Sequence, residues 1–382
     1  MIYKSENMKV NKERLVIFPF LLILFIFLFS CQESDTSDET VNYQPQVYSD
    51  DWQISTPQQQ GLNPEDFEYI YKKANNISHL YSLLVVKNGF LIAEKYFNEV
   101  QLNDSFPIAS VTKCYLSALM GIAIREGIIP DVHQKMVNYF PEFSWENLDP
   151  RKSQITIQQM LQMRSGYPWE EMDGYYDELW PQFDNWLPLI VEFPLTSDPG
   201  TRFGYSNLTS HILGIIIARA YGYDLLSFAQ AYLCEPLGVN LTKWWKDSLG
   251  YYYGHGDMHF TPRDMAKFGL LYLNNGIYNE QQIVPVEWIE ESLTPYSFNI
   301  YGREILTYIH QLNYGYKWLS GTVGNHDIKF AWGHGGQLIV ILYDLRMVIV
   351  TTADYLPGQY GQAAWNKEKS VLDLVGEFIS RL

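Results

Sequence analysis

Residues 107–127 read PIASVTKCYLSALMGIAIREG, a stretch rich in Ala, Leu and Ile that ends in a glycine. This composition predicts one helix that begins at Ser110 and has Gly127 at its C-terminal cap, while Pro107 disfavours helix just before the start. Apolar residues on nearly every side of the helix predict that it is buried. Lys113 follows Ser110 by three residues, so both side chains share one face of the helix.

The Ser110–Lys113 pair is the first candidate for chemistry. Burial lowers the pKa of a lysine towards neutrality, and a neutral amine beside a serine hydroxyl makes a nucleophile and its base. The positive field of a helix N-terminus also reaches the serine hydroxyl and amide. Ser-x-x-Lys alone is a common spacing, but burying a lysine charge without purpose is costly. The pair is therefore predicted to be catalytic.

A second motif, Tyr205-Ser-Asn207, closes a loop that starts at Pro199-Gly200. Ser206 or Asn207 is the expected N-cap of the helix that follows. A nearby cation lowers the pKa of a tyrosine, so Tyr205 is predicted to carry a proton between nucleophile and leaving group. Asn207 is predicted to donate to a substrate carbonyl.

A third motif, His334-Gly335-Gly336-Gln337, is expected to open a strand. Glycines within a strand often mark a close approach of backbone to a ligand. We expect the amide of Gln337 to pair with the amide of Ser110 and bind a developing oxyanion, with His334, Gly335 and Gly336 lining the pocket. Taken alone, the motif is equally consistent with a hairpin turn that carries an incidental histidine.

The three motifs, in this order, resemble the serine β-lactamase and penicillin-binding-protein superfamily, specifically its class C-like branch of serine hydrolases. The resemblance runs from about Trp52 to the C-terminus and includes Val-Val-Lys-Asn-Gly at 85–89. It implies that Ser110 is the acylated nucleophile, with Lys113 and Tyr205 as general bases and acids. It implies no metal and no organic cofactor. In motif context the chain is similar to esterases and 6-aminohexanoate-dimer hydrolases.

The third motif departs from the family pattern. The β-lactamases usually carry Lys-Thr-Gly on this strand, where Lys and Thr meet the substrate carboxylate. His334 is only partly charged near neutral pH, and Gly335 has no hydroxyl. We therefore expect a serine hydrolase acting on a small-molecule or short-peptide ester or amide. A D-alanyl-D-alanine carboxypeptidase or β-lactamase is the alternative within the class, and a non-catalytic surface-binding lipoprotein is the alternative outside it.

Strand signals lie at both ends of the chain, with helix signals between them. Asn88-Gly89 between two β-rich runs predicts a hairpin. We expect strands at 81–87, 90–97, 315–319, 329–332, 337–342 and 347–352, and helices at 64–74, 154–164, 206–221, 225–233, 261–275 and 365–381. The pattern predicts an α+β domain over 51–382, with an antiparallel sheet built from both termini and flanked by helices, and an inserted, mainly helical subdomain. The resemblance implies a β-lactamase/transpeptidase-like fold.

The N-terminus has the organisation of an export signal. Basic residues precede an apolar run at 15–29, which is shorter than the roughly 20 residues that a membrane span needs. Leu28-Phe29-Ser30-Cys31 resembles the bacterial lipobox. We expect a lipoprotein signal peptide over 1–31 with Cys31 lipidated, then a flexible acidic tether over 32–50. The protein would then be exported and lipid-anchored on the periplasmic or cell-surface face of a bacterial membrane; an uncleaved anchor is the alternative.

The formal net charge of −16 argues against nucleic acid as a partner. Cys114 and Cys234 are expected to be two buried thiols rather than a disulfide, and no Cys/His spacing predicts a zinc site.

Further polar and aromatic residues are weaker candidates. Glu170 and Glu171 are expected at a solvated pocket edge rather than as a deacylation base. His255 and His259 are expected in a loop or pocket wall rather than at a metal. Five aromatics form an apolar acyl pocket or pack the helical subdomain: Trp169, Tyr175, Tyr176, Trp180 and Phe183.

Overall fold

The computed structural model describes residues 41–47, 52–174, 185–356, 359 and 361–382. The predicted signal segment and residues 32–40 and 48–50 of the predicted tether lie outside these ranges. The prediction of a flexible tether is wrong for residues 41–47, because they belong to the compact unit that starts at Val41. Tyr43 is buried and its ring stacks on Tyr71 at 5.0 Å. Aromatic burial at this point holds the segment against the domain.

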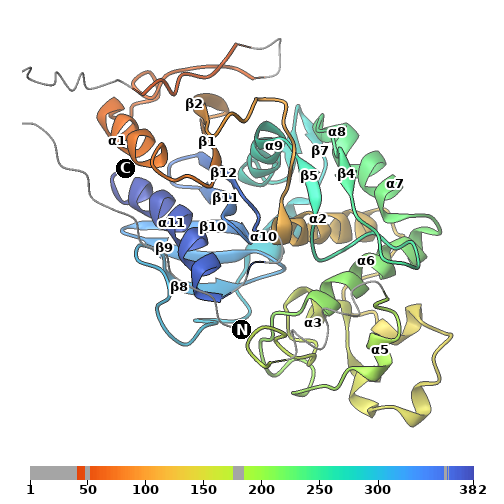
Figure 1. Cartoon of the computed structure of the whole chain (residues 1–382). Helices are drawn as coiled ribbons and strands as arrows, with labels where there is room; N and C mark the ends of the chain where they lie inside the picture. The colour runs from red at the N-terminus through yellow and green to blue at the C-terminus, as the bar shows by residue number, and fades with distance from the viewer. Residues whose placement is uncertain (1–40, 48–51, 175–184, 357–358, 360) are drawn as a thin grey trace, which may run out of the picture. The chain divides into compact units, whose positions relative to one another are not determined.

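Within the described residues the main sheet has seven strands, all antiparallel, in the order β2-β1-β12-β11-β10-β9-β8 (Figure 1). Their bounds are β1 Leu80–Lys87, β2 Phe90–Tyr96, β8 His310–Tyr314, β9 Leu319–Val323, β10 His326–Gly333, β11 Gln337–Leu342 and β12 Met347–Ala353. Because β1 pairs with β12, the two ends of the domain meet in the middle of the sheet, as predicted.

The central strands are buried on both faces. Leu84 and Val86 of β1 join one hydrophobic core, whereas Leu83 and Val85 join the other. Successive side chains of a strand point to opposite faces, so two covered faces require an unbroken apolar run. This explains why the strand segments show little polar alternation.

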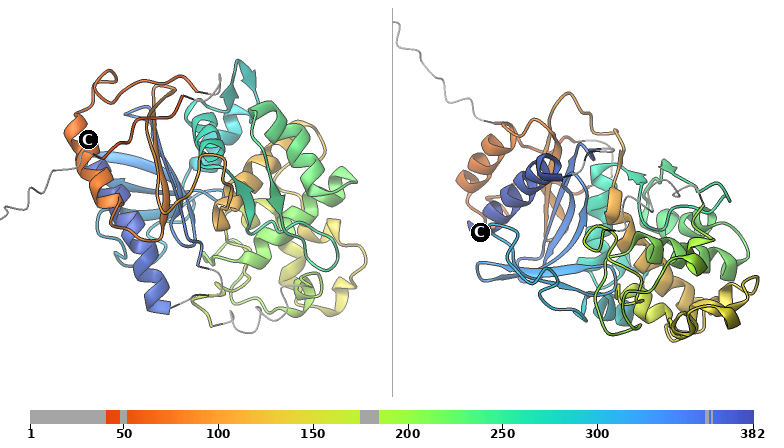
Figure 2. Two further views of the ribbon diagram at one scale, coloured as in Figure 1. Left: turned by 45° about the horizontal axis from the view of Figure 1, so that its top comes forward. Right: turned by 60° about the horizontal axis from the view of Figure 1, so that its bottom comes forward.

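Helices cover both faces of the sheet. Helices α1 (Pro64–Ala74) and α11 (Gly361–Ser380) lie side by side on one face, where Tyr69 donates to Glu377 at 2.9 Å (Figure 2). Helices α2 (Thr112–Arg125) and α9 (Pro262–Leu273) contribute to the core on the other face. The bounds of α1, the hairpin at Asn88-Gly89 and the burial of α2 confirm their predictions.

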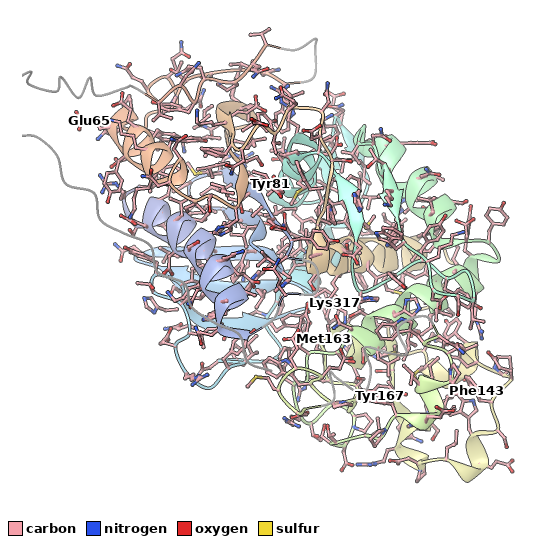
Figure 3. All side chains as sticks on the ribbon, in the orientation of Figure 1. Glu65, Tyr81, Phe143, Met163, Tyr167 and Lys317 are labelled. Carbon is pink, nitrogen blue, oxygen red and sulfur yellow. The ribbon has the colours of Figure 1, made fainter. Side chains whose placement is uncertain are left out.

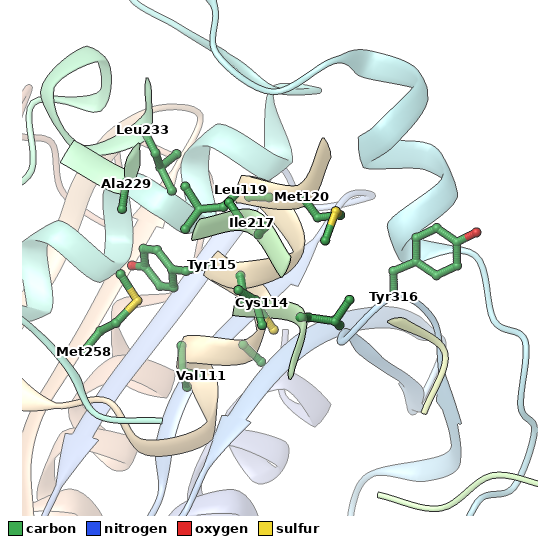
Figure 4. Close-up of a cluster of buried hydrophobic side chains, with 14 of the residues drawn as sticks. Val111, Cys114, Tyr115, Leu119, Met120, Ile217, Ala229, Leu233, Met258 and Tyr316 are labelled. Atoms are coloured by element: carbon green, nitrogen blue, oxygen red, sulfur yellow. The ribbon is translucent and has the colours of Figure 1, made fainter. Parts of the chain in front are cut away.

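Helix α2 lies in the core between the sheet and the helical part of the chain. Figure 4 shows its Cys114 and Tyr115 among side chains that include Ile217 from helix α6. Helix α6 spans Asn207–Tyr221 and is slightly longer than α2. The other described elements between β2 and β8 are shorter: β3 Phe106–Pro107, η2 Ala109–Val111, η3 Met136–Tyr139, η4 Trp145–Asn147, η5 Pro150–Gln154, α3 Ile157–Leu161, α5 Leu189–Glu192, α7 Leu225–Ala229, η7 Gln230–Cys234, α8 Glu235–Leu237, β4 Lys243–Trp244, β5 Met258–Phe260, β6 Ile277–Tyr278, β7 Gln281–Gln282 and α10 Val286–Leu293.

Two element predictions need correction. The strand expected at 315–319 is displaced, since β9 begins only at Leu319, and the helix expected at 154–164 shortens to α3. Strand β8 was not predicted, because it lies at the sheet edge and His310 and Gln311 are exposed. An edge strand needs no apolar alternation to pair on one side.

Among the described helices, none is by itself long and apolar enough to cross a bilayer. Only a pair bent by 82°, α6 with the segment Leu225–Leu237, meets the length and composition criteria together.

Candidate active site

Ser110 lies in the short 3-10 turn η2, immediately before α2, rather than in the first turn of α2 itself. Its neighbour Ala109 has a φ of 44°, in the left-handed region that residues with a side chain rarely adopt. The amide of Ile108 donates to the carbonyl of Met258 at 2.9 Å and anchors the start of the turn. The turn leaves Ser110 half-buried, at the end of a buried helix.

Lys113 is completely buried and has three polar neighbours. Its Nζ lies 2.9 Å from Ser110 Oγ, 2.8 Å from Asn207 Oδ1 and 2.6 Å from the carbonyl oxygen of His255. Burial lowers the pKa of Lys113 to about 8, although the charges of nearby carboxylates oppose this shift. The protonated amine donates to all three oxygens. When the amine is neutral, two of its partners still accept its two N–H bonds, and its lone pair is then available to the Ser110 hydroxyl.

Tyr205 and Asn207 flank Ser206, which is the N-cap of α6 and accepts from the Thr209 amide at 3.1 Å. The Tyr205 ring centre lies 4.9 Å from Lys113 Nζ, and its hydroxyl hydrogen-bonds with Ser110. Burial raises the pKa of Tyr205 well above its usual value, while the Ser110 hydrogen bond opposes the rise. The predicted lowering of this pKa is therefore wrong. Tyr205 contributes a neutral hydroxyl.

Glu170 is buried beneath the second motif. Its carboxylate accepts from the Ser206 hydroxyl at 2.9 Å and from the amides of Asn207 at 3.0 Å and Leu208 at 2.9 Å. Burial raises the pKa of Glu170, and these hydrogen bonds oppose the rise. The prediction of a solvated edge is wrong for Glu170, which caps the N-terminus of α6, where negative charge is favourable. Glu171 is exposed, as expected.

The third motif forms a turn, because β10 ends at Gly333 and β11 begins at Gln337. Gly333 is the residue that comes close to the nucleophile: a Cβ there would lie 2.5 Å from the carbonyl oxygen of Ile108 and 3.3 Å from the Cβ of Ala109. The sheet backbone nearest Ser110 is therefore that of Gly333 and the amide that follows it.

Gln337 is completely buried and belongs to the sheet. Its side chain donates to the carbonyl of Ala353 at 2.7 Å and accepts from the Ala353 amide at 3.1 Å. A group without exposed surface does not reach a substrate, so the oxyanion role predicted for the Gln337 amide is wrong. The residue instead ties the end of the turn to β12.

Gly335 and Gly336 are buried and do not line a pocket. A Cβ on Gly335 would lie 2.1 Å from the carbonyl of Asp354, and one on Gly336 would lie 2.8 Å from Cβ of Val371. Their φ values of 84° and 101° are those that glycine adopts without strain. Both glycines let the turn close onto β12 and α11, which corrects their predicted role.

The carbonyl of His255 reaches Lys113 because the loop that carries it is held on α6. The Gly254 amide donates to His211 Nδ1 at 3.3 Å, and His211 Nε2 lies 3.1 Å from the Asp247 carboxylate. The side chains of His211 and Asp247 have no exposed surface. Since Nδ1 accepts, the imidazole of His211 is neutral and its Nε2–H donates to Asp247.

The ring of His255 lies 4.8 Å from that of Trp186, in the layer behind Lys113. His259 lies in β5, paired with Lys243. His255 therefore has the expected loop placement, whereas His259 belongs to a strand. Among the residues that the structure describes, no group of three His, Cys, Asp or Glu is arranged to hold a metal ion.

Trp169 is buried and contacts Phe203 at 5.3 Å and Tyr301 at 5.2 Å between ring centres. The other aromatics predicted with it, residues 175, 176, 180 and 183, lie outside the described ranges. Cys114 and Cys234 are free and buried, which confirms the prediction of two thiols.

Sequence reasoning missed four features of the site. They are the close approach of Gly333, the carbonyl of His255, the buried carboxylate of Glu368 in α11 and the buried amine of Lys317. Lys317 is buried near α2 and donates to the carbonyl of Met160 at 2.8 Å, and its Nζ lies 3.2 Å from Met163 Sδ (Figure 3). A lysine between Tyr316 and Trp318 was the available signal for its burial.

Comparisons with known proteins show the family of the chain. The family described as Beta-lactamase matches residues 80–372. Beta-lactamase-like protein 2 of Dictyostelium discoideum is 23% identical over 352 residues, which are 80% of this chain and 60% of that protein. The 6-aminohexanoate-dimer hydrolase of Paenarthrobacter ureafaciens is 25% identical over 231 residues, 56% of each chain. The chain thus spans less than two thirds of either relative.

Among solved structures, a protein from Bacillus anthracis assigned as a 6-aminohexanoate-dimer hydrolase superposes with a TM-score of 0.65 and 22% identity, over 81% of this chain and 80% of that one. This likeness confirms the predicted β-lactamase/transpeptidase-like fold.

Proposed function

Since the chain belongs to the β-lactamase family, we propose that it is a serine hydrolase that cleaves an ester or amide bond through an acyl-enzyme on Ser110. The observation that carries the proposal is the set of three neighbours around the Lys113 amine. In its neutral state the amine keeps two N–H bonds for two of these oxygens, and its lone pair is available to the Ser110 hydroxyl 2.9 Å away. The buried Lys317 also contacts a serine hydroxyl, that of Ser210 at 3.2 Å, but Ser210 is completely buried, whereas Ser110 is half-buried and keeps surface that a substrate can reach.

In the acylation step, the neutral amine of Lys113 takes the proton of Ser110 as Ser110 Oγ attacks the substrate carbonyl carbon. A C–O bond forms and the carbonyl oxygen becomes an oxyanion. The amides of Ser110 and of His334, the residue after Gly333, bind this oxyanion. The intermediate collapses, the bond to the leaving group breaks, and the leaving group receives the proton from Lys113 through the Tyr205 hydroxyl.

In the deacylation step, water attacks the acyl carbonyl while Lys113 and Tyr205 together accept its proton. The bond to Ser110 Oγ breaks, the serine regains a proton, and the acid product leaves. Tyr205 acts as a neutral relay throughout, because burial keeps its pKa high. Lys113, with a pKa of about 8, exchanges protons at the pH where the enzyme works.

The preferred substrate class is an ester or amide without a carboxylate beside the scissile bond. In the family motif Lys/His-x-Gly, the glycine lies near the nucleophile, and here that glycine is Gly333. Ala331 and Trp332 then stand where β-lactamases hold the substrate carboxylate, and neither offers a cation. The Trp332 indole is itself engaged, because it donates to the Glu368 carboxylate at 2.6 Å. The lack of a cation at residues 331 and 332 disfavours β-lactams and peptides ending in D-alanine.

Intact mass spectrometry tests the covalent mechanism. The domain from residue 41 onward is incubated with a fluorophosphonate and, separately, with a penicillin. We expect a fluorophosphonate adduct that Ser110→Ala abolishes, and no lasting penicillin adduct or turnover.

The outcomes separate the alternatives. Hydrolysis of penicillin, or release of D-alanine from a peptide, would favour the β-lactamase or carboxypeptidase assignment. An absence of any adduct, with no ester hydrolysed in a substrate panel, would favour a non-catalytic surface-binding lipoprotein. A matched Ser117→Ala variant in the same helix should leave every adduct unchanged.

We also propose that the full chain is exported and anchored to a bacterial membrane through a lipid on Cys31. The proposal is supported by the lipobox-like run 28–31 and the apolar segment before it. Cys31→Ser should move the protein to the soluble fraction or block its processing. If fractionation and apparent mass stay as in the wild type, the anchor is not at Cys31.

A further inference from the structure

Glu368 of α11 is a buried carboxylate that receives three donors from one turn. It is 7% exposed. Its Oε1 accepts from the Trp332 indole at 2.6 Å, and its Oε2 accepts from the Gly335 amide at 2.9 Å and lies 2.8 Å from His334 Nδ1. A side chain 34 positions along the chain thus contacts three of the four residues from Trp332 to Gly335. Charge-assisted hydrogen bonds of this kind are the strong ones.

The imidazole of His334 has an acceptor at each nitrogen. Nδ1 faces the Glu368 carboxylate, and Nε2 lies 3.1 Å from the carbonyl oxygen of Gln359. A neutral imidazole has only one N–H, whereas an imidazolium donates at both positions. The contacts therefore favour the charged ring. Burial is the largest single influence and lowers the pKa of His334, but the hydrogen bonds to Glu368 and Gln359 and the charges of Glu368 and Glu171 together outweigh it, so the pKa is raised.

The charges around His334 come from several elements. Glu368 lies on α11, the exposed Glu171 lies on the loop after α3, and both favour the imidazolium. The carbonyl of Asp354, after β12, lies close behind Gly335, and the Asp354 carboxylate accepts from the Leu356 amide at 3.0 Å. Burial raises the pKa of Tyr301, and the charges of the same two glutamates raise it further. Glu368 and Glu171 thus add negative potential at the ring.

The turn has little freedom apart from this contact. Gly336 packs directly on Val371, and the Thr351 hydroxyl donates to the Gly336 carbonyl at 2.7 Å. Gly333, at the other end, packs on the backbone that precedes Ser110. The turn is therefore wedged between the nucleophile and α11, and Glu368 is the polar contact from the α11 side.

We propose that Glu368 is a positioning residue that, paired with the His334 imidazolium, clamps the turn 333–336 so that the amide after Gly333 faces Ser110, and that loss of the imidazolium proton releases the clamp. The expected effect on acylation rests on the proposed function. The charge of the His334 ring does not, because it depends only on the contacts that the ring makes. As pH rises through the His334 pKa, one ring nitrogen loses its hydrogen and faces an acceptor unpaired, which weakens the clamp.

The first test measures the ring itself. His334 is titrated by NMR in the Ser110→Ala background, where chemistry is absent, and assigned with His334→Gln. We expect its pKa to lie above the ordinary value and to fall by about one unit or more in Glu368→Gln, the usual effect of removing an adjacent opposite charge. Glu377→Gln, on the same helix but bonded to Tyr69 and Lys73, should leave it unchanged.

The second test measures the rate at which the fluorophosphonate modifies Ser110 from pH 5.5 to 8, a reaction in which Ser110 Oγ attacks phosphorus, a P–O bond forms and fluoride leaves. Glu368→Gln should react about 10- to 100-fold more slowly than the wild type at pH 7, the scale of a misplaced reacting group. The deficit should shrink towards pH 5.5, where the variant's ring regains its proton. The ratio of the wild-type rate to the Glu368→Gln rate removes the pH dependence that both proteins share through Lys113. Glu377→Gln should match the wild type, and Trp332→Phe should keep the His334 pKa within a few tenths of a unit.

Each failure has its own signature. If Glu368→Gln leaves the His334 pKa unchanged, the paired clamp is wrong, whatever the enzyme does. If the pKa falls but the acylation ratio is flat with pH, the pair exists but does not position the nucleophile. If no variant or wild type is acylated while the NMR shift is present, the proposed function fails and the clamp stands.

Discussion

Lys113 and Lys152 are buried lysines whose pKa burial lowers to about 8 in each case. The two lysines differ in their hydrogen-bond partners. Lys152 donates to two backbone carbonyls, of Val191 at 2.6 Å and Phe193 at 2.7 Å, so its surroundings hold an amine in place. Lys113 contacts one backbone carbonyl, that of His255, the side-chain oxygen of Asn207 and, in addition, the Ser110 hydroxyl. The same lowered pKa is therefore structural at one lysine and useful for proton transfer at the other.

At the residue scale, acylation should follow the titration of Lys113. Only the neutral amine accepts the Ser110 proton, so in the His334→Gln variant, where the clamp does not titrate, the rate should rise about tenfold per pH unit below pH 8 and level off above it. Lys113→Met should lower the rate by about 10²–10⁴-fold, the usual contribution of a general base. Stopped-flow or mass-resolved acylation from pH 6 to 10 measures both.

Lys152→Met is the matched control, because it removes a lysine of similar pKa that does not face Ser110. It should leave the midpoint of the rate profile near pH 8. A midpoint that moves with Lys152, or a Lys113→Met rate within tenfold of the wild type, contradicts the assignment.

At the element scale, the N-terminus of α6 carries two catalytic candidates because Glu170 caps it from below. Glu170→Gln exchanges a buried acceptor of three hydrogen bonds for a weaker one. We expect a loss of about 1–3 kcal/mol in the free energy of unfolding and no accumulation of acyl-enzyme. Denaturant unfolding and burst kinetics measure the two quantities. The exposed Glu171→Gln should change stability by less than about 0.5 kcal/mol.

An acyl-enzyme that builds up in Glu170→Gln at unchanged stability would instead make Glu170 the base for deacylation.

The turn between β10 and β11 leads to a second prediction at this scale. Gly333→Ala would place a methyl group 2.5 Å from the Ile108 carbonyl, so the strand must move away from the nucleophile. Losing one oxyanion donor typically costs about 10²–10³-fold in rate, and we expect a similar loss of acylation. The control is Gly324→Ala, in the neighbouring hairpin turn, where nothing lies within 4 Å of the added atom. Equal rates for the two variants would exclude a role for Gly333.

At the scale of the whole molecule, the chain before α1 is tied to the domain by a buried ion pair. Arg263 of α9 bonds Glu94 of β2 at 2.8 and 2.6 Å and the carbonyl of Gln46 at 2.8 Å. Arg263→Met leaves the Glu94 carboxylate buried without its cation, which should cost about 3–5 kcal/mol. Acylation per folded molecule should not change, since the pair lies outside the site.

Chemical denaturation with a parallel adduct assay checks this. Arg381→Met breaks an exposed pair with Asp66 and should cost less than about 1 kcal/mol. Similar losses from the two variants would mean that burial of the Arg263 pair adds nothing.

Part of the candidate site could be predicted from the sequence. Ser110 and Lys113 are three residues apart in a run whose apolar character already implies burial, so local spacing places them together. The hairpin at Asn88-Gly89 and the N-cap at Ser206 are likewise local. Their geometry depends on neighbours within about four residues, and such information is present in the sequence.

The remainder depended on contacts between distant segments. The choice of Gly333 over Gln337 is a matter of strand register, and a shift of a few residues leaves the apolar pattern intact. The His255 acceptor is a backbone carbonyl, which every residue carries, so side-chain identity gives no signal for it. Glu170 and Glu368 look like surface acids until packing encloses them.

The sequence by itself therefore determined the family and the Ser110–Lys113 pair as the candidate for chemistry, whereas only the tertiary structure decided which backbone and which buried carboxylates lie around that pair. The physical reason is that helix spacing is set by local geometry, while burial and register are set by what the rest of the chain packs against.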